Sequence, residues 1–150
     1  MLAATERMVF ASITFEHFAA NTLAPEYRVI VFANGKAIYE GKKNVFKTGT
    51  YKLDVTKQAL AKINYLAVQF LKNSNPMVKD ADNKVERNSA RPIVITTLSE
   101  GNDAAPRIVK DDLSGNPFWL VMFRNQVEEA IGIPAYTVRG IGFPNDGEEK

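Results

Sequence analysis

An Asn-Gly pair between two strand-like runs constrains this chain more than any other feature. The segment LAPEYRVIVFANGKAIYEG spans residues 23–41, and its YRVIVF run is dense in the β-branched and aromatic residues that favour strands. A type I′ turn needs positive φ at both central residues, and Asn34-Gly35 tolerates that best. We therefore predict a central strand over 26–33, a two-residue loop, and a register that sets Val31 opposite Ile38.

Apolar periodicity divides the rest of the chain into further elements. Alternation predicts a first strand within residues 8–18, and TYKL predicts a fourth at 50–53. Apolar residues at helical spacing predict a helix that begins at a cap, Asp54 or Thr56, and runs to about Lys72. IVITTL and PRIVK predict a second hairpin.

A second helix is expected near the end of the sequence. Asn116-Pro117 is typical of a helix start, with Asn as the cap and Pro at the first helical position. The helix should end at Gly132 and Pro134. Its buried stripe is predicted to be Leu120, Phe123, Val127 and Ile131.

Together these elements predict an α+β fold: an antiparallel meander of about four strands, a helix, a β-hairpin and a helix, with the helices on one face of the sheet. The chain has 150 residues, the usual size of one domain. We expect one globular domain over 1–138 and a loosely held tail over 139–150. The polar stretch 73–92 exceeds the usual loop length of about 12–15 residues, which makes it a candidate for function.

Composition excludes several classes of protein. Lys and Arg number 19 against 17 Asp and Glu, too even a balance to signal nucleic acid or an anionic membrane. No apolar run reaches the ~18 residues of a membrane span. Without cysteine the chain can form neither a disulfide nor a thiolate site. The start, MLAATERMVF, lacks the pattern of a signal peptide, and the compartment stays open.

A family resemblance rests on the order of several short signals, which are Pro25-x-Tyr27-x-Val29-x-Val31, Asn34-Gly35, Tyr39-x-Gly41, Gly49-Thr50 and the amphipathic helix that follows. With these signals the chain resembles an uncharacterised bacterial domain family, often found in exported proteins and lipoproteins, whose members look like C-x3-C-P-x-Y-x-V-x-I followed by D/N-G-x-x-x-Y-x-G. Ala20 and Ala24 stand where that family has its cysteines. The resemblance covers about residues 12–140 and implies a related fold, no assigned activity, and export if a leader has been removed, otherwise a cytoplasmic location.

The ionisable residues offer little metal or cofactor chemistry. His17 is the only histidine, and alternation places it on the apolar face of the first strand, where we expect a structural role. One histidine without cysteine predicts no zinc site. DADNKVE supplies oxygen ligands, but Val85 stands where a calcium EF-hand needs Gly and Arg91 where it needs Glu. No nucleotide-binding or nucleophile-elbow motif occurs, and we expect no cofactor.

Two further patterns have structural explanations. The acid pairs Asp111-Asp112 and Glu128-Glu129 are expected to be solvated or to cap a helix. The segment 36–52 carries five lysines among aromatic residues, a pattern that could bind single-stranded nucleic acid. Lysine at turns and edge strands also discourages edge-to-edge pairing, which is the explanation we favour.

The sequence thus favours a non-enzymatic binding domain that recognises a protein or another extended ligand. Arg, Met and Tyr are enriched at interfaces. The alternatives are a small hydrolase that uses acidic residues and His17, or nucleic-acid binding through 36–52. A purely structural oligomer is a third class. No catalytic residue is assigned, and the predicted contact residues are Tyr39, Tyr51, Met77, Arg87 and Arg91.

Overall fold

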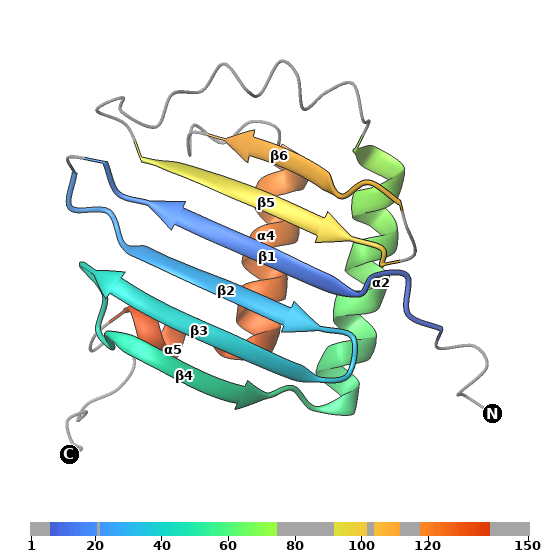
Figure 1. The fold of residues 1–150 in the computed structure, drawn as a ribbon, viewed down its shortest axis with the longest axis horizontal. Helices are drawn as coiled ribbons and strands as arrows, with labels where there is room; N and C mark the ends of the chain where they lie inside the picture. The colour runs from blue at the N-terminus through green and yellow to red at the C-terminus, as the bar shows by residue number, and fades with distance from the viewer. Residues whose placement is uncertain (1–6, 21, 75–91, 102–103, 112–117, 139–150) are drawn as a thin grey trace.

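Six strands and three helices make up the part of the chain that the structure, a computed structural model, describes (Figure 1). The described residues are 7–20, 22–74, 92–101, 104–111 and 118–138. The elements are β1 (Ser12–Phe18), β2 (Glu26–Phe32), β3 (Lys36–Lys43), β4 (Gly49–Asp54), α2 (Lys57–Asn73), β5 (Ile93–Ser99), β6 (Arg107–Asp111), α4 (Phe118–Ile131) and α5 (Pro134–Thr137).

All six strands belong to one antiparallel sheet with the order β4-β3-β2-β1-β5-β6. The first four strands form the predicted meander. The sheet holds more strands than that meander because the β5–β6 hairpin pairs alongside β1. To reach that position, the chain leaves β4 at one edge and crosses behind the sheet through α2 (Figure 1). The prediction of an α+β fold is confirmed.

The loop between β2 and β3 differs from the predicted two-residue turn. The Gly35 N–H donates to the carbonyl of Phe32 over 3.0 Å. Gly35 has φ +91°, whereas Asn34 is not among the described residues with positive φ. The loop therefore spans residues 33–35, a tight turn closed by a left-handed glycine, which is the common three-residue hairpin. The Asn34 side chain supports it by accepting from the Lys36 N–H over 2.9 Å.

This extra loop residue shifts the strand register by one position. Val31 lies opposite Ala37, and Ile30 lies opposite Ile38. The prediction that Val31 faces Ile38 is therefore wrong. A shift of one residue moves every side chain of the return strand to the other face, so Ala37 and Tyr39 enter the core and Ile38 lies on the sheet face away from the helices.

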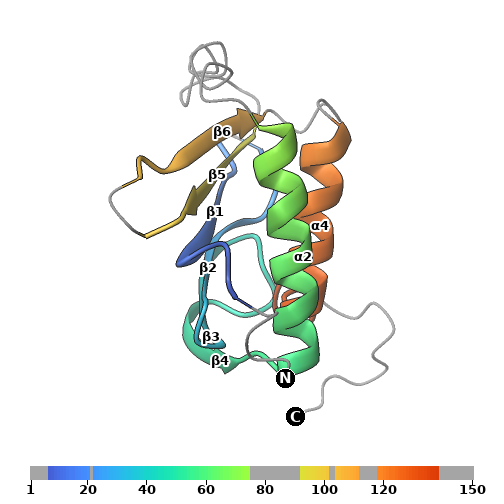
Figure 2. The same ribbon diagram turned by 90° about the vertical axis from the view of Figure 1, so that its right-hand side faces the viewer.

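Both long helices cover the same face of the sheet and run side by side (Figure 2). The Thr56 hydroxyl caps α2 by accepting from the Ala59 N–H over 3.1 Å. Both predicted apolar stripes reach the core: Ile63, Ala67 and Phe70 from α2 are buried, as are Leu120, Phe123 and Val127 from α4. The Asn116-Pro117 start lies outside the described residues. Among the helices described, none is long and apolar enough to span a bilayer.

Next to the β4 edge of the sheet, Tyr39 and Gly41 of β3 pack closely together and against the Lys47 backbone, a contact called the joint below. The Tyr39 hydroxyl lies over Gly41 and donates to the Lys47 carbonyl over 2.8 Å. The Lys47 N–H in turn donates to the Tyr136 carbonyl of α5 over 2.8 Å. Gly41 is required there because a Cβ would overlap the Lys47 carbonyl and crowd the Tyr39 hydroxyl, a typical reason for glycine inside a strand.

We predict that Gly41→Ala lowers the free energy of unfolding by about 1–3 kcal/mol, the usual cost of overpacking. Chemical denaturation measures this change directly. Lys42→Ala is the matched control, since Lys42 is the next residue of the same strand and is exposed. A Gly41→Ala protein as stable as the control would contradict the joint described here.

Candidate functional site

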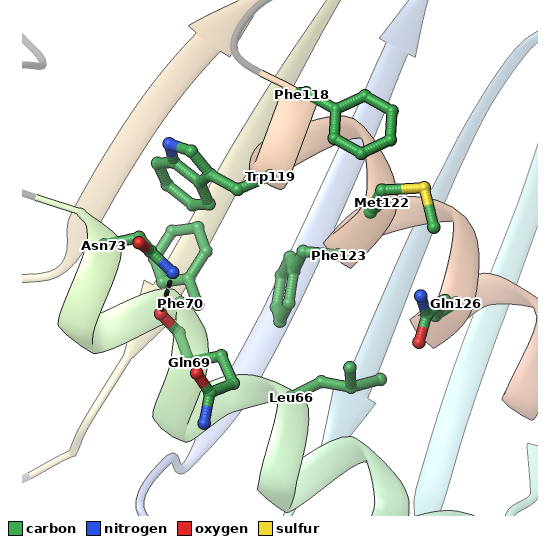
Figure 3. A pocket seen from close by; sticks show the side chains of 9 residues that line it. All are labelled: Leu66, Gln69, Phe70, Asn73, Phe118, Trp119, Met122, Phe123 and Gln126. Atoms are coloured by element: carbon green, nitrogen blue, oxygen red, sulfur yellow. Dashed lines mark hydrogen bonds between the residues drawn. The ribbon is translucent and has the colours of Figure 1, made fainter.

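A groove runs between α2 and α4 on the side facing away from the sheet (Figure 3). Its cavity volume is about 340 Å³, within the usual range for sites that hold a small ligand or a side chain of a partner. Both helices contribute to it over several turns. The lining residues are Leu66, Gln69, Phe70, Asn73, Phe118, Trp119, Met122, Phe123 and Gln126.

The floor of the groove is filled by packed aromatic rings, and one of its walls is open to solvent. Phe70 is fully buried and packs against Trp119 and Phe123, with ring centroids 5.6 Å and 4.8 Å away. Along the α4 wall, Phe118 and Met122 are 69% and 37% exposed. Figure 3 shows these two side chains along one side of the hollow. The groove therefore combines a preformed base with apolar groups that water still contacts.

The polar side-chain groups of the lining are neutral: three amides and the indole N–H of Trp119. Gln69 and Asn73 come from α2 and Gln126 from α4. The Asn73 Nδ2 donates to the Gln69 backbone carbonyl over 2.8 Å, which holds that side chain against its own helix. No charged side chain lines the groove among the residues that the structure describes. Such a surface accepts an uncharged group and can orient it through a few hydrogen bonds.

A second candidate site is the buried polar cluster between the sheet and α4. Glu128 uses both carboxylate oxygens: Oε1 accepts from the Tyr27 hydroxyl over 2.7 Å, and Oε2 shares a hydrogen bond of 2.7 Å with His17 Nε2. The rings of His17 and Tyr27 stack with centroids 3.9 Å apart. The side chains of His17 and Glu128 are each only 10% exposed. This cluster joins β1, β2 and α4.

A buried ion pair lies one helical turn away. Arg124 Nη1 donates to Asp111 Oδ1 over 2.8 Å, and both side chains are buried. Asp111 ends β6, so it does not precede a helix as a solvated cap. The expectation that solvation or capping explains Asp111 and Glu128 is therefore wrong: each is buried because it has a long-range partner. Asp112 lies outside the described residues.

The cluster meets part of what the hydrolase alternative requires, since it brings His17 to a carboxylate. The remaining hydroxyl in the cluster belongs to Tyr27. Burial raises the pKa of this hydroxyl far above its ordinary value, and the Glu128 carboxylate raises it further. Tyr27 thus stays protonated and is the opposite of an activated nucleophile. The geometry favours a structural role for these groups, and the hydrolase alternative stays a prediction.

The two predicted contact residues that the structure describes, Tyr39 and Tyr51, pack against each other. Tyr39 is fully buried, and Tyr51 is half-buried against Tyr39 and Tyr136, with ring centroids 6.0 Å and 5.3 Å away. Lys47, from the lysine-rich segment, places its Nζ 5.8 Å from the Tyr51 ring centroid. These aromatic rings pack against one another and against a cation. Met77, Arg87 and Arg91 lie outside the described residues, as do the acids of DADNKVE.

The groove was not among the sequence predictions, although one signal for it exists. The run FWLVMF at 118–123 has six consecutive apolar residues. A helix that packs on a sheet buries only the residues spaced three or four apart on one side. Leu120 and Phe123 take the buried positions. The surplus, Phe118 and Met122, must therefore lie on another side of the helix, which is where the groove forms.

These features define a small α+β domain with two helices on one face, an apolar groove between them and a buried polar cluster beneath α4. The model of the family described as Domain of unknown function (DUF6438) matches residues 11–130. The chain belongs to that family, in agreement with the predicted membership of an uncharacterised domain family. No curated protein and no solved structure matches the chain. Across the described residues, no group of three or more acidic or histidine side chains could hold a metal ion.

We predict that Glu128→Ala destabilises the protein by about 3–5 kcal/mol, because it leaves two buried polar partners without their acceptor. Glu129→Ala is the control: this neighbour is exposed, and its loss should change stability by no more than about 0.5 kcal/mol. Urea denaturation of both variants tests the difference. Equal stability of the two would show that the cluster contributes nothing to the fold.

We also predict alkaline destabilisation from the buried tyrosines. Burial raises the pKa of Tyr39 to about 12, and Tyr51 and Glu128 add to this effect. Once unfolded, Tyr27 and Tyr39 ionise with the ordinary pKa of 10.0. Above that pH the unfolded state binds fewer protons, so stability is complete below it and falls by up to about 1.4 kcal/mol per pH unit for each tyrosine.

The check is denaturant unfolding at a series of pH values on either side of 10.0. Tyr27→Phe and Tyr39→Phe should each flatten the alkaline fall in stability. Tyr65→Phe should leave the slope unchanged, because Tyr65 is exposed. An identical slope in all three variants would mean that other groups cause the fall.

Proposed function

We propose that this protein is a binding domain whose α2–α4 groove receives an apolar segment of a protein partner. The observation that carries the proposal is the exposure of Phe118 and Met122 beside a preformed cavity of about 340 Å³. Exposed apolar groups around a hollow lose water contact when a partner fills it, and this burial favours binding by about 25 cal/mol for each Å².

The residue types of the groove support a protein partner. Trp, Phe and Met are enriched at the centres of protein interfaces. Met122 is flexible and polarisable, and it can adapt its shape to an inserted side chain. The Phe70, Trp119 and Phe123 rings already pack against one another, so the floor need not be ordered on binding. Preorganisation of this kind lowers the cost of association.

Other surfaces of the described fold support binding less well. The tyrosines predicted as sheet contacts are used in internal packing, and the buried polar cluster satisfies its own hydrogen bonds. Leu23 is 88% exposed, but it is a single side chain in the β1–β2 connection. Isolated exposed apolar residues are normal on protein surfaces.

The experiment is a selection of random displayed peptides on the intact protein. Peptides that bind the groove should lose at least about tenfold in affinity for Met122→Lys, because the substitution places a charge in the apolar wall where it must be desolvated. Leu23→Lys introduces the same change at an exposed site outside the groove and should bind as the unmodified protein does.

Thermal unfolding of both lysine variants establishes that each is folded. Enriched peptides that bind Met122→Lys and the unmodified protein equally would place the binding surface elsewhere. A selection that enriches no peptide would likewise count against a peptide-binding groove.

A further inference from the structure

The helices that form the groove also define the segment it would hold. Resting on the function proposed above, we propose that the bound segment is an amphipathic α-helix with acidic residues along the edge that lies over α2. The partner helix would place its apolar stripe against the lining and its carboxylates beside the lysines of α2. The hydrogen-bonding capacity of the groove favours a helix, and the lysines of α2 favour acidic residues along one edge of that helix.

The lining cannot satisfy an extended backbone. An extended segment brings an N–H and a carbonyl at every residue, and each must find a partner when it is buried. The groove offers three side-chain amides, one of which, Asn73, already donates to the backbone of α2. It also offers the indole N–H of Trp119, which can only donate. A helix satisfies its backbone internally and therefore needs few polar groups from the surface that it contacts.

The walls also have the shape that a helix requires. Leu66, Gln69 and Asn73 are spaced three or four residues apart along α2, and Phe118, Met122 and Gln126 are spaced four apart along α4. Each set forms a ridge on its helix, and side chains of a third helix pack into the hollow between two such ridges. Recognition of an amphipathic helix in an apolar groove is a recurrent mode of protein binding.

The charges along the two walls are unequal. Along its whole length α2 carries Lys57, Lys62 and Lys72, all exposed, and no acidic residue. Lys57 lies about half a turn around the helix from Leu66 and so is on the side away from the groove, whereas Lys72 is on the outer side that adjoins the wall. Lys62 lies one turn before Leu66 on the same side of the helix and so continues the groove wall. On α4 the exposed charge is Glu129, beyond the last lining residue of that helix, while Arg124 and Glu128 are buried and paired.

A partner helix therefore meets positive potential along one edge. Complementary carboxylates on that edge would speed association and set the direction in which the helix lies. A second copy of this chain is a poorer occupant, because pairing through this side of α2 would bring Lys62 and Lys72 of both copies together with no acid on either α2 helix. Like charges opposed across an interface disfavour such an arrangement.

The test uses a displayed library on a single-helix scaffold whose apolar stripe is fixed as leucine and whose two flanking edges are randomised. It is panned at low salt on the intact protein and on the variant Lys62→Gln/Lys72→Gln. The control variant Lys42→Gln/Lys52→Gln removes the same charge from β3 and β4, where these lysines are exposed.

We expect Asp and Glu to be enriched about threefold or more at positions of one edge, the factor typical of exposed charge pairs. The enrichment should persist on the control, vanish on the α2 variant, and weaken in high salt because these charges are exposed to solvent. Clones without an acidic edge, or an acidic edge that survives on the α2 variant, would overturn the charge inference and leave the groove standing. A library that yields no binders, while unconstrained peptides bind the groove, would overturn the helical occupant.

Two outcomes concern the groove itself. Clones that bind Met122→Lys as tightly as the unmodified protein would overturn the proposed function together with this inference. Sedimentation of the unmodified protein alone shows whether a second copy fills the groove. A dimer that Met122→Lys converts to a monomer would overturn the acidic partner.

Discussion

The carboxylate of Glu128 holds α4 on the sheet, and the outer surface of the domain depends on that contact. It binds side chains of β1 and β2 at once, and the Arg124–Asp111 pair adds a tie to β6 one turn earlier. Buried hydrogen bonds of this kind have narrow geometric tolerance, so they fix both the height and the rotation of the helix. With α4 held in this way, Phe123 forms part of the floor of the groove and Met122 forms part of its exposed wall.

Local periodicity was sufficient to predict most of the architecture. Short-range rules account for the alternating residues of β1, the β-branched and aromatic run of β2, the cap at Thr56 and the helical stripes of α2 and α4. Each of these elements formed near its expected position. Helices segregated to one face of an antiparallel sheet are one of the few stable arrangements of such elements, and both long helices take it here (Figure 2). These features depend on neighbours along the chain, which a single sequence contains.

Features that depend on distant residues were predicted less well. Asn34-Gly35 is compatible with two hairpin loops, and the choice between them moved the whole of β3 by one register position. Asp111 and Glu128 looked like surface acids, since their partners lie far along the chain at Arg124, His17 and Tyr27. The groove was missed for the same reason: it exists only where the surplus apolar residues of α4 meet those of α2.

The joint between Tyr39 and Gly41 bears on how relatives of this protein would diverge. These two residues belong to the motif by which the chain resembles an uncharacterised family, and their contact couples β3 to the Lys47 backbone and through it to α5. Neither residue touches the groove. A motif of this kind is inherited with the architecture, and fold alone does not dictate function. Relatives that keep the joint can therefore change the residues of α2 and α4 independently, and the binding proposed for this groove would then differ between them on the same scaffold.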